Sequence, residues 1–201
     1  MLDKSLDYCP LMMTKTDTKN SPRHALPEGY AFRFYRAGDE KDWAAIECSI
    51  GQFDTEAAAL RMFRGEFIEN QRLKPEERML FVIDPEGNAV ATASLWDGDY
   101  FGEIRQRFHW VAVTDACTGK GIAKAMLSRV LDLYNELGYE GFLYCRTSTW
   151  SYQAIGIYKK LGLVPYREDA SPFKDVPDEG FAEKNLAAWA AVENKHALYR
   201  K

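Results

Sequence analysis

The stretch from residue 107 to residue 138 constrains the fold of this chain more than any other. Residues 107–113 are aromatic and β-branched and predict a strand. They lead into residues 114–121, a loop with two glycines, and then into residues 122–137, where apolar side chains recur at intervals of three and four. Gly138 follows, where a left-handed residue often ends a helix. A strand that enters an amphipathic helix through glycines exposes backbone N–H groups at the helix start, which suits a phosphate group.

Other parts of the chain predict strands and helices on both sides of this stretch. The predicted strands are 30–36, 79–83, 89–96, 107–113, 141–146, 164–167 and 197–200. The predicted helices are 40–50, 54–71, 122–137, 152–161 and 181–193, with Asp39 and Ser151 as caps of the first and fourth. The first half of the chain contains a β-hairpin, and the second half alternates between strands and helices. This order predicts a mixed α/β sheet with helices on both faces.

Length and composition predict one globular domain with a polar extension. The chain has 201 residues, of which 46% are hydrophobic and 28% charged. Residues 1–28 mix lysines with Asp, Thr, Ser and Pro, and we expect them to form a mobile or loosely docked arm. Residues 29–201 are then expected to form the single domain.

Charge and cysteine spacing exclude several classes of protein. The 26 basic residues are outnumbered by 30 acidic ones, which disfavours a nucleic-acid partner. The four cysteines form no CxxC pair and the three histidines add no metal-type spacing, so we expect no metal and free thiols in a reducing cytoplasm. No apolar run has the length of a membrane helix or the character of a signal peptide, so we expect a cytoplasmic protein without a membrane partner.

Three phosphate-binding motifs compete for the glycine loop. A P-loop needs glycine at position 114 and Ser or Thr after its lysine, but position 114 is Thr and Lys120 is followed by Gly121. The dinucleotide fingerprint fits Gly119 and Gly121 but finds Lys124 at its third glycine. The P-loop therefore fails twice and the dinucleotide motif fits poorly.

The third motif fits. Residues 113–123 resemble the acyl-CoA loop of the GNAT N-acetyltransferase superfamily, whose pattern is Arg/Gln-x-x-Gly-x-Gly/Ala after a valine. Val113, Gly121 and Ala123 stand at the matching positions. Thr118 replaces the Arg or Gln, a change that bears on affinity more than on identity because the family contacts the pyrophosphate mainly through backbone.

A second family motif lies downstream of the first. Its pattern is Asn-x-x-Ala-x-x-x-Tyr-x-x-x-Gly-Phe, and the chain matches it at Ala154, Tyr158 and Gly162. Ser151 replaces the Asn, and Leu163 replaces the Phe. Two motifs in the right order, each on the expected element, make the resemblance specific over about residues 108–165.

The resemblance implies a fold, an activity and a set of site residues. The fold is α/β, with a GNAT-like central mixed sheet of about six to seven strands flanked by helices on both faces. The activity is transfer of an acetyl group from acetyl-CoA to an amine acceptor by direct attack on the thioester. Tyr158 is implied to protonate the departing thiolate, and backbone N–H groups of strand 109–113 to bind the thioester oxygen. The residues implied to bind acetyl-CoA are Val111, Ala112, Val113, Thr118, Gly119, Lys120, Gly121, Ile122, Ala123, Ser151 and Tyr158.

An ammonium acceptor must lose a proton before it can attack, so a base or a water chain is needed. His109 is the first candidate, because alternation places it on one face with Val111 and Val113 and because imidazole titrates near neutral pH. Glu66 and Glu103 are rival bases. Cys117 lies beside the loop, but without a suitably placed His/Asp set we do not expect it to act as a nucleophile.

The sequence leaves the acceptor and the partner state open. We expect a small-molecule or peptide amine, bound by segments 51–78, 97–107 and 168–196, and a homodimer is compatible with the resemblance. The alternative function is a non-catalytic CoA-binding sensor or interaction module of the same fold, which the departures at Thr118 and Ser151 would favour.

Overall fold

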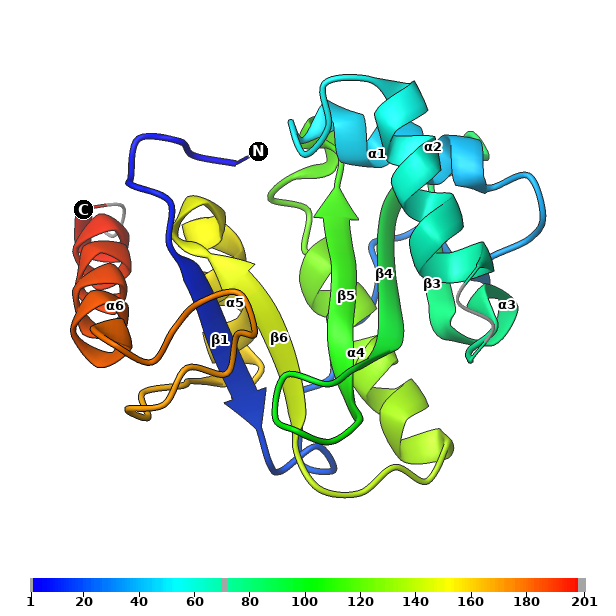
Figure 1. Ribbon diagram of the computed structural model, residues 1–201. Helices are drawn as coiled ribbons and strands as arrows, with labels where there is room; N and C mark the ends of the chain where they lie inside the picture. Colours follow the sequence, from blue (N-terminus) through cyan, green and yellow to red (C-terminus); the bar gives the residue numbers. More distant parts are fainter. Residues whose placement is uncertain (1, 70–71, 199–201) are drawn as a thin grey trace. The chain divides into compact units, whose positions relative to one another are not determined.

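The computed structural model describes residues 2–69 and 72–198 of the chain, and these residues group into two compact units (Figure 1). The first unit comprises residues 19–96 and 108–140. The second comprises residues 2–18, 97–107 and 141–198. Each unit contains strands and helices, so the α/β class predicted from the sequence is confirmed.

The first unit is built on four neighbouring strands. Their order is β2 (Ala31–Phe34), β3 (Met79–Ile83), β4 (Ala89–Gly98) and β5 (Arg105–Val113). β3 runs antiparallel to both β2 and β4, and its pairing with β4 shifts by one residue at Val82/Ile83. The tight turn between β3 and β4 is held by Asp84, whose carboxylate accepts the backbone N–H of Asn88 at 2.7 Å.

Helices cover both faces of these strands. Met79 and Phe81 of β3 enter an aromatic cluster with side chains of α1 (Glu40–Ser49), α2 (Glu56–Phe63) and the π-helical turn η1 (Arg64–Ile68). Leu80 and Val82 alternate with them, are equally buried and face the opposite side. Helix α4 (Ile122–Glu136) contacts β3, and its apolar face covers that side. The short helices α3 (Pro75–Arg78) and η2 (Asp115–Cys117) complete the unit.

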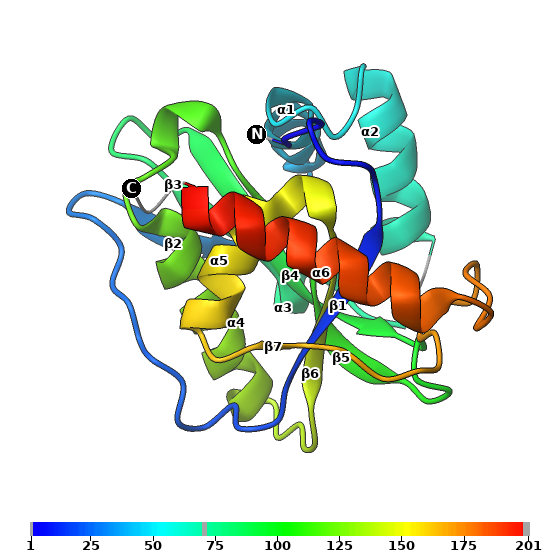
Figure 2. The same ribbon diagram turned by 90° about the vertical axis from the view of Figure 1, so that its left-hand side faces the viewer.

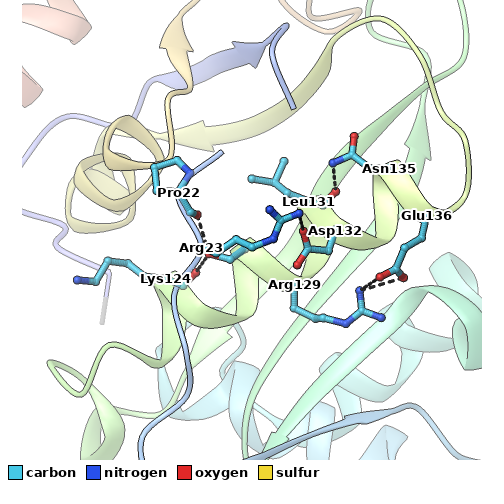
Figure 3. A network of polar contacts seen from close by, with 9 residues as sticks. Pro22, Arg23, Lys124, Arg129, Leu131, Asp132, Asn135 and Glu136 are labelled. Atoms are coloured by element: carbon cyan, nitrogen blue, oxygen red, sulfur yellow. Dashed lines mark hydrogen bonds and ion pairs between the residues drawn. The ribbon is translucent and has the colours of Figure 1, made fainter. Parts of the chain in front are cut away.

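Pro22 and Arg23, in the segment before β2, contact α4 (Figure 3). Ser128 on α4 donates a hydrogen bond to the carbonyl of Pro22 at 3.2 Å, and the Arg23 guanidinium pairs with Asp132 at 2.5 Å. A second ion pair on the same helix joins Arg129 to Glu136 at 3.0 Å.

The second unit is built on three strands with β1 (Pro10–Lys15) in the middle. β1 runs antiparallel to β6 (Leu143–Ser148) on one side and to β7 (Val164–Pro165) on the other. Helix α5 (Tyr152–Lys160) follows β6 through the short turn η3 (Thr149–Ser151). Helix α6 (Phe181–Leu198) packs against α5 and β1, and Figure 2 shows it lying across them.

Strand β1 corrects the prediction of an arm over residues 1–28. Leu11, Met12 and Met13 are buried, and all six residues of β1 pair with β6. This segment is a strand because it pairs with β6 and β7, which are distant from it in the sequence, and not because of its local composition. With β1 included, the described residues form seven strands, which agrees with the predicted six to seven.

Apart from the last strand, the other predicted elements are found, strand 79–83 with the predicted ends and the rest with shifted ends. Ala197 and Leu198 belong to α6, so the strand predicted at 197–200 is wrong over these two residues, while Tyr199 and Arg200 lie outside the described residues. Asp39 precedes α1, but its carboxylate binds Arg33 at 2.6 Å instead of capping the helix. Thr55 caps α2 by accepting the backbone N–H of Ala58 at 3.2 Å.

Candidate active site

Strand β5 is distorted at Trp110. Among the described residues, Trp110 is the one residue other than glycine with a positive φ, at 48°. A left-handed residue costs roughly 1–2 kcal/mol and turns the strand that contains it. Such a residue interrupts the regular pattern in which the backbone N–H groups of a strand point to its neighbours.

The distortion also changes the face on which His109 lies. Ala112 and Trp110 belong to the aromatic cluster that packs on α1 and α2, and the His109 ring contacts Phe67 of that cluster at a centroid distance of 5.8 Å. His109 and Ala112 are three positions apart, so regular alternation would place them on opposite faces. The prediction that His109 shares a face with Val111 and Val113 is therefore wrong, because Trp110 interrupts the alternation.

His109 forms a close pair with Glu66. Its Nε2 lies 2.9 Å from Oε2 of Glu66, and the two side chains are 11% and 32% exposed. The Ser94 hydroxyl donates to the His109 carbonyl at 2.9 Å and fixes the backbone at this point. Glu66 sits in η1, where the helix widens to a π-turn, a feature that is frequent at functional sites.

The glycine loop leaves room for a ligand at the start of α4. Gly119 and Gly121 have φ angles of 83° and 84°, and apart from their neighbours in the chain no described atom lies within 4 Å of a Cβ built on either. Gly121 precedes the first helical residue, Ile122, and within the described chain no side chain caps this start. The first turn also carries no acidic residue. The backbone donors of the first turn are therefore uncapped by described side chains, beside glycines with open space around them, as a pyrophosphate would require.

The side chains around the loop add positive charge. Lys120 lies 3.2 Å from the Tyr30 hydroxyl, and that hydrogen bond raises the pKa of the lysine. Thr118 is exposed and turns its hydroxyl back to the Thr114 carbonyl at 3.5 Å. Cys117 is buried, 4.0 Å from both the Tyr30 oxygen and the Lys120 nitrogen. These contacts hold the loop to the segment before β2.

Tyr158 is placed by the second unit. It lies on α5, is 4% exposed, and its hydroxyl hydrogen-bonds the thiol of Cys145 on β6. Burial raises the pKa of the Cys145 thiol to about 12, so this sulfur stays protonated. Ser151 precedes α5, and no side-chain cap is formed by it in the described structure, so its predicted capping role is wrong.

Two other carboxylates, Glu103 and Glu47, are poor candidates for a base. Glu103 is exposed and pairs with Arg105 through a 2.7 Å hydrogen bond. Glu47, on α1, is 2% exposed, and burial raises the pKa of its carboxyl to about 8. Its Oε1 finds no hydrogen-bond partner among the described residues. A carboxyl that is mostly neutral at pH 7 is not a ready proton acceptor.

The sequence predicted most of these site residues, but it did not predict the left-handed conformation of Trp110 or the contact between Glu66 and His109. His109, Val111–Val113 and the loop from Thr118 to Ala123 belong to the first unit, and Ser151 and Tyr158 belong to the second. The left-handed Trp110 had no sequence signal, because nothing distinguishes a distorted tryptophan from a regular one. Glu66 and His109 were separate alternatives in the sequence, and the structure makes them one contact.

The described residues contain neither a metal-type cluster nor a helix that could span a membrane. No group of three or more His, Cys, Asp or Glu side chains is placed to hold an ion. None of the described helices combines the length and apolar character needed to cross a bilayer.

Comparison with known proteins gives a family match. The model of the Acetyltransferase (GNAT) family matches residues 41–163, which is more than half of the chain. A search of curated proteins finds no match.

Several solved structures are similar in fold. A GCN5-related N-acetyltransferase from Sphaerobacter thermophilus has a TM-score of 0.62 and 23% identity, over 78% of this chain and 48% of that one. A GNAT-family acetyltransferase from Colwellia psychrerythraea has a TM-score of 0.59 and 15% identity, over 80% and 55%. A tandem GNAT protein from the clavulanic acid biosynthesis pathway has a TM-score of 0.55 and 12% identity, over 82% and 52%. The chain spans about half the length of these structures, and at such identities the likeness concerns the fold.

Proposed function

Because the chain belongs to the GNAT acetyltransferase family, we propose that it transfers an acetyl group from acetyl-CoA to an amine acceptor by direct attack on the thioester. The observation that carries this proposal is the start of α4, where two left-handed glycines face open space and no described side chain caps the helix. Backbone donors left in this way fit a pyrophosphate.

We assign the binding of acetyl-CoA to residues of both family motifs. The backbone of Val111–Val113 pairs with the pantetheine arm as an added strand would. The loop from Thr118 to Ala123 holds the pyrophosphate, with Lys120 supplying charge. Ser151 and Tyr158 enter the proposal by their places in the second motif.

Acetyl-CoA supplies the acetyl group as a thioester, whose carbonyl carbon the amine attacks. Backbone N–H groups beside Trp110 stabilise the negative charge that develops on the carbonyl oxygen. His109 takes the proton that the ammonium must lose. Tyr158 gives its phenolic proton to the departing sulfur, and the second N–H proton of the amine restores the phenol through solvent.

Partners and location belong to the same proposal. The acceptor is a small-molecule or peptide amine, and the protein acts in the cytoplasm without a metal, nucleic acid or membrane partner. A homodimer is compatible with this activity. Because β1 pairs with β6 and β7, we extend the proposed acetyltransferase domain from residues 29–201 to include β1.

Binding of acetyl-CoA is the first test. A ligand that binds the folded state alone stabilises it by about 2.7 kcal/mol at a concentration of 100 times its dissociation constant. We therefore expect CoA and acetyl-CoA to raise the melting temperature, and NADH and ATP to raise it far less. A larger shift with NADH than with CoA would contradict the proposal.

Replacement of Tyr158 by Phe tests the chemistry. The ring and its packing are kept, so acetyl-CoA affinity should stay nearly unchanged while single-turnover acetyl transfer falls by about 10²–10⁴-fold, the usual span for a general acid. Single-turnover measurement excludes product release as the slow step. Tyr152→Phe, a buried tyrosine on the same helix, is the matched control and should transfer at the wild-type rate. A wild-type rate in Tyr158→Phe would remove Tyr158 from the reaction.

In a second candidate function, the protein binds acetyl-CoA at the same site but does not transfer the acetyl group. The departures from the motifs at Thr118 and Ser151 favour a CoA-binding sensor or interaction module of the same fold. Binding of acetyl-CoA without release of free thiol, across a panel of alkylamines, arylalkylamines, amino acids and peptides, would select it.

A further inference from the structure

Two residues that the sequence offers as alternative bases are in direct contact. Glu66 and His109 are 43 positions apart in the chain, yet their Oε2 and Nε2 atoms lie 2.9 Å from each other. Both belong to the first unit, Glu66 on η1 and His109 on β5. At this distance the carboxylate accepts a hydrogen bond from Nε2–H, because an ionised carboxylate has no proton to donate.

The surroundings hold the imidazole in one orientation. The rings of Phe67 and Trp110 flank it at centroid distances of 5.8 and 5.5 Å. Phe67 is itself buried and follows Glu66 in η1. The π-turn places Glu66 and Phe67 as neighbours that both reach His109, one with its carboxylate and one with its ring.

We propose that Glu66 is the positioning residue for His109, and that the pair acts as one unit in taking the proton from the acceptor ammonium. This inference rests on the proposed acetyl transfer. With Nε2–H held by Glu66, the neutral imidazole keeps its lone pair on Nδ1, which is then the basic atom.

Each proton that the ammonium group loses has a defined acceptor. The ammonium nitrogen gives one proton to Nδ1 and regains a lone pair, with which it attacks the thioester carbon. The carbon–sulfur bond breaks as the amide forms, and the second N–H proton ends on the thiol sulfur by way of Tyr158. The imidazolium passes its proton to solvent, and the Glu66 carboxylate stabilises the cation while it exists. Orienting carboxylates have this role beside other catalytic histidines.

Glu66→Ala and Glu66→Gln separate orientation from charge. Glu66→Ala removes both the acceptor and the charge, whereas Glu66→Gln keeps an oxygen that can accept Nε2–H but removes the charge. We expect single-turnover acetyl transfer to fall by about 10–10²-fold in Glu66→Ala, within the span that general bases contribute, and by less in Glu66→Gln. Acetyl-CoA affinity should be unchanged in both.

Imidazole ¹⁵N spectra give a readout that does not depend on activity. The chain has three histidines, so His109→Asn identifies the His109 signals by their loss. At alkaline pH we expect the Nε2–H tautomer in the wild type and in Glu66→Gln, and a mixture of both tautomers in Glu66→Ala. Glu136→Ala, which removes a glutamate paired with Arg129 outside the site, is the matched control and should change neither the tautomer nor the rate.

Each outcome decides between the two proposals. Wild-type transfer by Glu66→Ala, or an unchanged tautomer, would overturn the role of Glu66 and leave acetyl transfer standing. A wild-type chain that acetylates neither 2-phenylethylamine nor any other amine of the panel would overturn acetyl transfer, and the proton step with it.

Discussion

Helix α4 begins and ends at glycines of similar conformation, yet its two ends are satisfied in different ways. Gly121 before the helix has a φ of 84°, and Gly138 after it has a φ of 71°. At the carboxyl end the N–H of Gly138 bonds the Asn135 carbonyl at 3.0 Å, and that of Tyr139 bonds the Tyr134 carbonyl at 3.2 Å. At the amino end no described side chain caps the helix.

The difference shows which glycine serves folding and which is available to a ligand. At Gly138 the chain satisfies its own carbonyl groups, as a left-handed helix ending usually does. At Gly121 no described side chain caps the donors of the first turn, and Lys120 and Lys124 bring positive charge to the same end. The carboxyl end is therefore a structural feature, and the amino end fits an external anion.

The largest expected effect comes from valine at each glycine. Gly121→Val should weaken CoA binding by about 100-fold or more, roughly 3 kcal/mol, because its side chain covers the helix-start donors. Gly138→Val suffers the same kind of backbone strain at the other end and should bind CoA as the wild type does. Calorimetric titration measures the affinity, and thermal unfolding confirms that both variants fold.

Equal loss of CoA binding in the two valine variants would mean that strain, rather than access, controls the site. If Gly121→Val does not fold, Gly121→Ala and Gly138→Ala provide the same comparison with a single added carbon. Unchanged affinity in a folded Gly121 variant would make the loop purely structural.

The amino end of α4 could be predicted from the sequence because its signals are local. Two glycines, an apolar repeat and a final glycine all lie within residues 113–138, and each acts through its own backbone or its near neighbours. The two family motifs are also local signals, because each consists of residues at fixed spacing along one loop or one helix.

Strand β1 and the Glu66–His109 pair depend instead on distant parts of the chain. β1 is a strand because β6 and β7 pair with it, and its Leu-Met-Met run sits in a segment whose composition suggests a loose arm. The contact of Glu66 with His109 requires a π-turn and a left-handed Trp110, neither of which has a residue type that announces it. Distant pairing and local strain are what single-sequence reasoning cannot supply.

A smaller effect is expected from the charges at the amino end. Removing both lysines, as Lys120→Ala with Lys124→Ala, should weaken CoA binding by about tenfold, near 1.4 kcal/mol, and should flatten its dependence on salt. Arg129→Ala removes a cation farther along the same helix, where it pairs with Glu136, and should leave the affinity unchanged. Titrations at several salt concentrations measure both quantities. An unchanged salt dependence in the double variant would show that backbone donors alone hold the phosphates.

The smallest effect is a gain at the amino end from Thr118→Arg. Thr118 stands where the family pattern has Arg or Gln, and its side chain is exposed with its hydroxyl turned back to Thr114. A guanidinium there can reach a phosphate with two donors, but at an exposed site such a contact contributes only about 0.7 kcal/mol, or roughly threefold in affinity. Thr118→Lys should gain less, since an ammonium group lacks the planar fork. Glu140→Arg adds an arginine beyond the carboxyl end of α4 and should not change the affinity for CoA. An equal gain from Glu140→Arg and Thr118→Arg would mean that the net charge of the protein, and not the amino end of α4, determines how tightly CoA is bound.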